Sequence, residues 1–175
     1  METVWDRSEQ QEPRCGFGEM GICCRMCHMG PCRIDPFGQG AKLGVCGANA
    51  ELIVARNFCR MVAGGAAAHS DHGRSVARTL LLAAKNPESG YAVKDGNKLD
   101  KVAGILGVDA GNKTKEALAA AVAEKALSEF GRQEGELSFI KQAPEARQAL
   151  WRGLNIVPRG IDREIVEMML SLIHI

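Results

Sequence analysis

The chain has 175 residues, and its 22 lysines and arginines against 21 aspartates and glutamates give a formal net charge of +1. This balance argues against nucleic acid as a partner, because phosphate binding needs a clustered excess of cations. The hydrophobic content of 46% and charged content of 25% are typical of one ordinary folded domain and exclude disorder. The longest run without polar side chains, Met61–Ala68, is too short to span a membrane.

The first residues, 1–6, lack the basic and apolar regions of a secretory signal, so we expect a cytoplasmic protein. Thiols stay reduced in the cytosol. Six of the seven cysteines lie between Cys15 and Cys46. We therefore interpret them as metal ligands rather than as disulfide partners.

The predicted elements begin with an irregular, glycine-rich segment at 15–47, a composition typical of a loop that wraps a cofactor. Residues 48–84 are rich in alanine and leucine and predict one or two helices, with Gly64-Gly65 as the place for a bend. Asn86-Pro87 predicts the stop. One helical face of this segment carries Leu52, Ala55, Cys59 and Val62.

Four further helices are predicted beyond this segment. Their expected positions are Lys98–Leu106, Lys113–Phe130, Glu145–Leu154 and a last helix that begins at Asp162. In the second of them, Asn112 is available as a cap and an apolar face is expected from Leu118, Val122, Ala126 and Phe130.

The last helix is expected to have Asp162 as its N-cap, with Ile161 and Val166 in a hydrophobic staple. No comparable strand pattern occurs in the sequence. The predicted fold is mainly α, with an irregular cysteine-rich segment near the N-terminus.

The spacing Cys24-x2-Cys27-x4-Cys32-x13-Cys46 supplies four thiolates, the number that one iron–sulfur cluster takes from protein. Neighbouring glycines allow backbone N–H groups to approach cluster sulfur, and Arg25 and Arg33 place positive charge beside an anionic centre. A structural zinc site more often has two short Cys-x2-Cys pairs, and only one is present. The pattern favours iron–sulfur over zinc.

Cys15 and Cys23 remain outside this set and supply half of the ligands of a second cluster. Because successive residues point in different directions, Cys23 and Cys24 are not expected to face the same cluster. A two-fold dimer would present Cys15 and Cys23 twice and complete a shared cluster. The alternative is two free buried thiols, and the lone Cys59 is expected to be a small core residue.

The stretches CGFGEMGICCRMCHMGPCRI (15–34), GVCGA (44–48) and IVAR (53–56) closely resemble the N-terminal domain of the nickel-dependent, anaerobic carbon monoxide dehydrogenase family. The similarity extends through AAAHS (66–70) to GIDREIVEM (160–168). It covers nearly the whole chain, although 85–151 matches only loosely.

The resemblance implies a homodimer whose helical domain, here 1–169, holds two kinds of cluster. Cys24, Cys27, Cys32 and Cys46 would ligate a [4Fe-4S] cluster within each subunit, and Cys15 and Cys23 would ligate the shared one, [4Fe-4S] or [2Fe-2S]. In such enzymes carbon monoxide and water give carbon dioxide, two protons and two electrons. The electrons pass through these clusters to a ferredoxin-type acceptor.

The family's nickel–iron–sulfur centre is built from His and Cys residues of later α/β domains. After Cys46 this sequence has one cysteine and three histidines, which leaves no ligand set for such a centre. We therefore expect a fragment of an oxidoreductase that is inactive alone. The similarity stops after Met169, and we expect 170–175 to be a truncated or unrelated end.

Three of the four histidines occupy positions near the predicted functional segments. His69 and His72 match the first two positions of a histidine ladder that is proposed to conduct protons in the family, but Ser75 and Arg78 occupy the next two. The relay is therefore expected to be broken or differently routed, and a purely structural role for the pair is the alternative. His28, among the ligands, is expected to lie outside the coordination.

Two other functions remain open on the sequence alone. The related hybrid-cluster, hydroxylamine-reducing family also begins with a four-cysteine motif but lacks a pair equivalent to Cys15 and Cys23. A stand-alone electron carrier or a zinc-stabilised interaction module would need no catalytic ligands.

Overall fold

The computed structural model describes residues 1–174, with side chains through residue 171. Most of the described chain is helical, and its one sheet pairs two short strands, so the predicted mainly α fold is confirmed. The chain divides into two compact units, residues 1–62 with 168–175, and residues 63–167. No helix among the described residues is long and apolar enough to cross a membrane.

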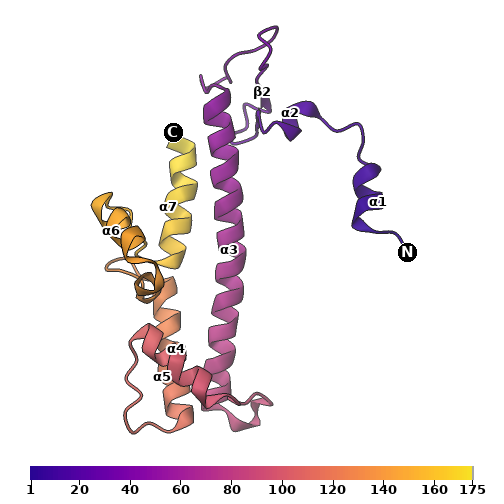
Figure 1. The fold of residues 1–175 in the computed structure, drawn as a ribbon. Coiled ribbons are helices and arrows are strands. Elements are labelled where there is room, and N and C mark those ends of the chain that lie inside the picture. Colours follow the sequence, from indigo (N-terminus) through magenta and orange to yellow (C-terminus); the bar gives the residue numbers. More distant parts are fainter. Residues whose placement is uncertain (175) are drawn as a thin grey trace. The chain divides into compact units, whose positions relative to one another are not determined.

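The first unit contains the cysteine-rich segment. Its elements are two short helices, α1 (Val4–Glu9) and α2 (Gly16–Glu19), the strands β1 (Cys23–Cys24) and β2 (Cys32–Arg33), and residues 50–62 of the long helix α3 (Figure 1). Its apolar core is small. The buried members are Cys24, Ile34, Ala48 and Ile53.

Helix α3 (Ala50–Lys85) is one helix of 36 residues that continues through Gly64-Gly65. It ends where the sequence predicted, because the Asn86 side chain accepts from the Glu88 N–H and starts a 3-10 turn, η1 (Pro87–Ser89). The predicted apolar face is wrong. Ala55 and Val62 are exposed, and the buried positions are Ile53, Arg56, Ala63, Ser70 and Ala77.

The reason is that polar residues share the buried face of α3. Arg56 lies against cysteine sulfur, and the Ser70 hydroxyl donates to Asp162 Oδ1 at 3.2 Å. Both partners lie outside the helix: Cys46 is in the irregular segment before α3, and Asp162 is 92 residues from Ser70. A pattern of apolar residues alone therefore places the buried face about one position away.

The second unit is a helical assembly whose remaining elements follow in chain order (Figure 1): α4 (Gly96–Leu106), α5 (Lys115–Phe130), a 3-10 turn η2 (Ser138–Gln142), α6 (Glu145–Gly153) and, through residue 167, α7 (Ile161–His174). Helices α4 and α5 pack together, with Leu99, Ala103, Leu118, Ala119 and Val122 buried between them. This cluster is the main apolar core of the unit.

The predicted helices occur, but two predicted caps are wrong. Helix α5 is capped by the Thr114 hydroxyl, which accepts from the Ala117 N–H at 3.2 Å, instead of by Asn112. Its predicted apolar face is confirmed, since Leu118, Val122 and Phe130 are buried and Ala126 is half-buried.

Helix α7 begins at Ile161, so Asp162 is not its cap. The Asp162 carboxylate instead accepts from Arg74 Nη2 at 2.5 and 2.7 Å, and the Arg74 guanidinium also lies 5.0 Å from the centre of the Phe130 ring. The expected staple is absent too, because Val166 is 54% exposed. An ion pair with a distant arginine outcompetes the local cap. The helix continues to residue 174, and residue 175 of the predicted 170–175 end lies outside the described residues.

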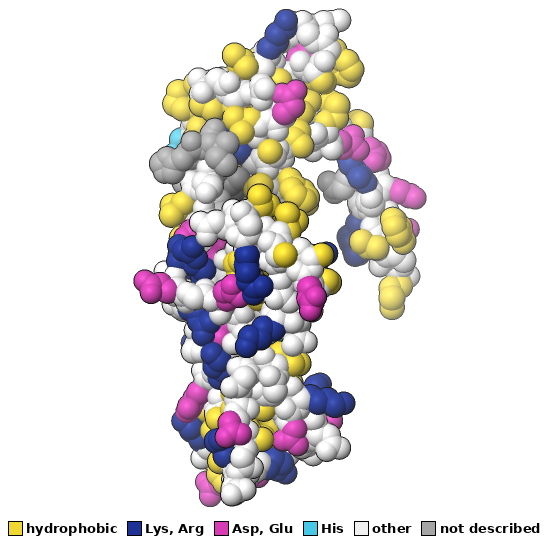
Figure 2. Space-filling model, turned by 60° about the vertical axis from the view of Figure 1, so that its left-hand side comes forward, with side chains coloured by type: hydrophobic (Ala, Val, Ile, Leu, Met, Phe, Trp, Pro, Cys, Tyr) yellow, Lys and Arg dark blue, Asp and Glu magenta, His cyan; other side chains and the backbone are white. Residues whose placement is uncertain are grey.

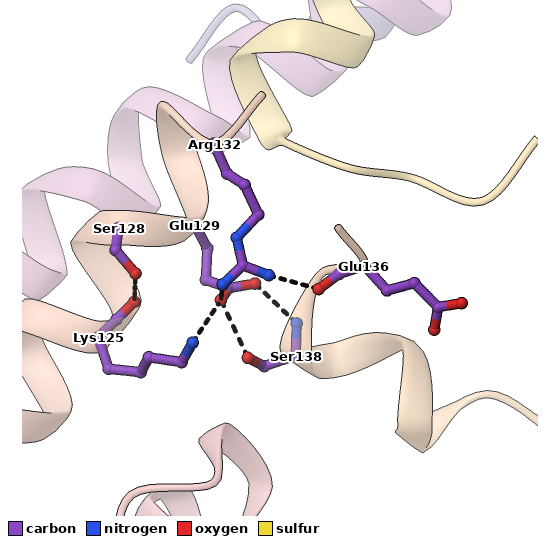
Figure 3. Close-up of polar contacts among 6 residues, drawn as sticks. All are labelled: Lys125, Ser128, Glu129, Arg132, Glu136 and Ser138. Atoms are coloured by element: carbon purple, nitrogen blue, oxygen red, sulfur yellow. Dashed lines mark hydrogen bonds and ion pairs between the residues drawn. The ribbon is translucent and has the colours of Figure 1, made fainter. Parts of the chain in front are cut away.

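A buried carboxylate ties α5 to the loop that follows it (Figure 3). Glu129 is 3% exposed and accepts from the Ser138 N–H at 2.7 Å and the Ser138 hydroxyl at 2.9 Å. Lys125 Nζ and Arg132 Nη2 lie 3.2 and 3.0 Å from Glu129 Oε1. Burial alone would raise the pKa of Glu129, but these hydrogen bonds and charges together lower it.

Candidate metal centre

Strand pairing brings two of the predicted ligands together. Cys24 of β1 lies opposite Cys32 of β2, and Cys23 lies opposite Arg33. Side chains that are directly opposite share one face of a ladder, and successive residues alternate between faces. Cys24 and Cys32 therefore face the same way and Cys23 faces the other, as expected for residues that serve different sites.

The four cysteines of the motif line one cavity of about 290 Å³ in the first unit. Cys24 is buried, Cys32 is half-buried, and Cys27 and Cys46 are exposed. The complete lining is Cys24, Met26, Cys27, Met29, Gly30, Cys32, Gly44, Val45, Cys46, Ala48, Ile53 and Arg56. The four cysteines of the sequence motif therefore lie around one cavity in the folded chain.

Glycine is required at one point of this wall. A Cβ at Gly30 would lie 3.0 Å from the Cys24 carbonyl oxygen and 3.2 Å from the Cys32 amide nitrogen. Both are backbone atoms of the paired strands, so they cannot move aside cheaply. A side chain at this position would push the two strands, and the cysteines on them, apart.

Backbone and side-chain donors reach the sulfur atoms. The Val45 N–H donates to Cys32 Sγ at 3.5 Å, and Arg56 Nη1 donates to Cys46 Sγ at 3.7 Å. The Ala48 N–H and then the Arg56 side chain lower the pKa of the Cys46 thiol. Because the thiolate is the metal-binding form, these contacts favour ligation.

Arg56 is a residue of the cavity wall that the sequence patterns did not reveal. It comes from α3, is 8% exposed and lines the cavity, and its Nε has no hydrogen-bond partner. Its contact with Cys46 raises the pKa of the guanidinium, which stays charged. The sequence held one signal for it. Arg56 comes three residues after Ile53 in the segment IVAR, so the two share one face of the predicted helix.

The two arginines expected beside the centre lie elsewhere. Arg25 is exposed, and Arg33 is exposed with its guanidinium 5.4 Å from the centre of the Phe17 ring. Neither lines the cavity. An arginine next to a cysteine in sequence does not bring its charge to the cavity, because successive side chains along a strand point to opposite faces.

The residues present fit a cluster. Among residues 1–171, no three His, Cys, Asp or Glu side chains converge on one point as ligands of a single ion would. The four thiols instead surround a hollow, which suits a group whose several irons each take one thiolate. The unpartnered buried Arg56 Nε adds a donor without an acceptor.

The second pair of cysteines lies in the same unit but outside this cavity. Cys15 precedes α2 and is exposed in a separate, open hollow with Arg14 and Glu19, and Cys23 is half-buried. The structure does not bring Cys15 and Cys23 into one hollow. Their role as ligands of a shared cluster stays a prediction. Cys59 is half-buried and does not line the cavity of the four motif cysteines.

The histidines lie apart from the cysteine cavity. His28 is exposed and is not part of the cavity lining. In the second unit, His69 Nδ1 donates to the Gly65 carbonyl at 2.8 Å. His72 lines a groove with Ser75, Thr79 and Tyr91, and Arg78 does not belong to that lining. The proton relay through His69 and His72 stays a prediction.

Comparisons with known proteins show the family to which the chain belongs. The model of the Prismane/CO dehydrogenase family matches residues 22–174, and the chain belongs to that family. It is 54% identical over 169 residues to carbon monoxide dehydrogenase 1 of Methanosarcina acetivorans and 45% identical over 172 residues to carbon monoxide dehydrogenase 1 of Carboxydothermus hydrogenoformans. These matches cover 97% of this chain and 27% of each relative. The family's named enzymes are oxidoreductases.

Solved structures show the same fold. A nickel-free carbon monoxide dehydrogenase from Thermococcus sp. AM4 matches with a TM-score of 0.90 and 44% identity over 98% of this chain and 27% of that chain. An acetyl-CoA synthase/carbon monoxide dehydrogenase, described with NiZn[Fe4S4] and NiNi[Fe4S4] clusters, matches with a TM-score of 0.88 and 40% identity over 98% of this chain and 26% of that chain.

Proposed function

We propose that this chain is the electron-transferring N-terminal part of an anaerobic carbon monoxide dehydrogenase. The observation that carries the proposal is the cavity into which the motif gathers Cys24, Cys27, Cys32 and Cys46. A [4Fe-4S] cluster bound there would accept and release one electron at a time, and the four thiolates would hold it. Membership of this family supports the reaction that we propose for the whole protein. It would oxidise carbon monoxide with water to carbon dioxide and pass the electrons to a ferredoxin-type acceptor.

The chain's own residues support ligation and a protected site. The cavity wall is largely apolar, with Met26, Ala48 and Ile53 beside the thiols. Such a wall limits the access of water on the side of the buried Cys24. The Val45 N–H and Arg56 are placed to stabilise negative charge on Cys32 and Cys46. The nickel centre of the relatives would be held by residues beyond those present here.

A homodimer with a shared cluster is the second part of the proposal. Cys15 and Cys23 supply two thiolates, and the same pair from a second copy would supply the others. The first unit exposes large apolar side chains that a partner would cover, and hydrophobic side chains are visible on its surface in Figure 2. The exposed large hydrophobic residues of the first unit include Met29, Phe37, Leu43, Val45, Phe58 and Met61.

Metal analysis of anaerobically purified protein tests both parts. We expect about six irons and six sulfides per chain, four from the internal cluster and half of a shared four, and no zinc. The Cys15→Ala variant should lose the shared cluster and keep about four irons per chain, whereas Cys24→Ala should lose the internal one. Zinc in place of iron would contradict the proposal. An iron content of about six per chain in the Cys15→Ala variant would contradict the shared cluster.

A further inference from the structure

Arg56 differs from every other cation near the cysteines in its burial. Within residues 1–171 it is the only buried lysine or arginine. The neighbouring Arg60, one turn later on α3, is exposed and its Nη1 approaches Met26 Sδ at 3.9 Å. A charge withdrawn from water is screened far less than one on the surface.

The hydrogen bonding of Arg56 is incomplete. Its Nη1 donates to Cys46 Sγ at 3.7 Å, but its Nε is buried without an acceptor. A buried donor without a partner is costly, so native structures nearly always satisfy it. Arg56 lines the cavity of the four cysteines. An acceptor bound in that cavity would complete its hydrogen bonding.

We propose that Arg56 is a positioning residue that donates a hydrogen bond from Nε to sulfur of the bound cluster and raises the reduction potential of that cluster with its buried charge. The inference rests on the proposed cluster in this cavity. Reduction adds one negative charge to an already anionic group, and a fixed cation stabilises the reduced form more than the oxidised one. Arginine suits the role because it stays charged and presents several donors in one plane.

The test compares three variants with a reference chain that carries Cys15→Ala, so that a shared cluster does not contribute. Arg56→Gln removes the charge, Arg56→Lys keeps the charge but lacks Nε, and Arg60→Gln removes an exposed charge one turn away. Each protein is purified anaerobically, and its iron and sulfide are measured. The midpoint potential of the cluster is then obtained by a redox titration followed by electron paramagnetic resonance.

For Arg56→Gln we expect the reference iron content and at least a tenfold lower ratio of reduced to oxidised cluster at a fixed potential, which equals a negative shift of about 59 mV for one electron. Arg56→Lys should shift less in the same direction, because only the donor is lost. Arg60→Gln should change the ratio less than about twofold, since water screens its charge.

An Arg56→Gln chain that holds its cluster at an unchanged midpoint potential would overturn the inference and leave the proposed function intact. A shift of the midpoint potential in Arg60→Gln as large as that in Arg56→Gln would do the same. If Arg56→Gln binds no iron, Arg56→Lys decides: a loaded cluster with a lowered potential supports the inference, and an unchanged potential or loss of iron overturns it. A reference chain without iron would remove the proposed function itself.

Discussion

The two units of this chain are built on different physical principles. The cysteine-bearing unit has little regular structure before α3, and a cavity of about 290 Å³ lies beside its small core of Cys24, Ile34, Ala48 and Ile53. The helical unit of residues 63–167 packs α4 against α5 around Leu99, Ala103, Leu118, Ala119 and Val122. The first unit therefore leaves room for a cofactor to act as its core, whereas the second is stabilised by its own side chains.

The largest expected effect is the response to iron removal. Chelation under anaerobic conditions should expose residues 15–47 to trypsin, with cleavage after Arg25 and Arg33 becoming about tenfold faster or more, because loss of the metal removes what holds the segment together. Residues 63–167 should persist as a protected fragment, since their core contains no metal ligand of the motif.

Mass spectrometry of the fragments over time would measure both rates. Protein kept loaded with iron under the same conditions is the control for trypsin access. If trypsin digested the two units at equal rates after chelation, the cysteine-bearing unit would not depend on metal more than the helical unit does. An unchanged rate of cleavage at Arg25 and Arg33 would lead to the same conclusion.

The same contrast explains how much of the molecule could be predicted. Local signals place the helix ends well: Asn86-Pro87 ends α3, and Gly107, in the left-handed region at φ 69°, ends α4. The spacing of the four motif cysteines also predicts that they meet, because they lie within a short segment. Both predictions depend on neighbours in sequence.

Long-range partners account for what could not be predicted. The residues that sequence patterns misplaced in α3 and α7 are polar, and their partners lie outside the helix. Arg56 contacts Cys46 in the cysteine-rich segment, and Asp162 binds Arg74, 88 residues away in sequence. Aspartate is a favoured cap and serine is usually a surface residue. Residue type alone therefore suggests the wrong role for Asp162 and for Ser70, which bind each other in the folded chain. Only the folded chain shows which polar side chains find partners in the interior.

A smaller effect is expected from the buried Glu129. Replacing it in Glu129→Gln leaves the Lys125 and Arg132 charges without their carboxylate, which should lower the free energy of unfolding of the helical unit by about 2–3 kcal/mol at pH 7. The matched control is Glu124→Gln on the same helix. Its ion pair with Lys85 is 2.6 Å long but more than half exposed on both sides, so the loss should stay below about 1 kcal/mol.

The dependence on pH gives this prediction a second, independent check. The pKa of Glu129 is lowered in the folded chain from its usual 4.5. A group with a lowered folded pKa contributes stability above its unfolded pKa and loses it as the pH falls through the folded value. The difference between the original chain and Glu129→Gln should thus be full at pH 7 and shrink below pH 4.5.

Thermal unfolding followed by far-ultraviolet circular dichroism measures both quantities. Iron is removed from all proteins first, so that acid lability of a cluster does not enter. A difference that is constant from neutral to acidic pH would show that Glu129 acts through packing and not through its charge.

The smallest expected effect comes from a glycine pair at the end of α4. Gly104 is an exposed helix-interior residue with open space around its Cβ position, so Gly104→Ala should raise the free energy of unfolding by about 0.5–1 kcal/mol. Gly107 adopts φ 69° at the end of the same helix, so Gly107→Ala should lower it by about 1 kcal/mol. The two alanines differ only in the backbone conformation that they must adopt.

The same two variants also test whether the units are independent, because iron retention can be measured in them. Stabilising or destabilising α4 should shift the melting temperature of the helical unit by a few degrees. It should leave the rate of iron loss to a chelator unchanged, since the cavity wall is formed by residues 24–56. A rate of iron loss that follows the melting temperature would mean that the helical core, and not the thiolates with Arg56, governs how long the cysteine unit keeps its metal.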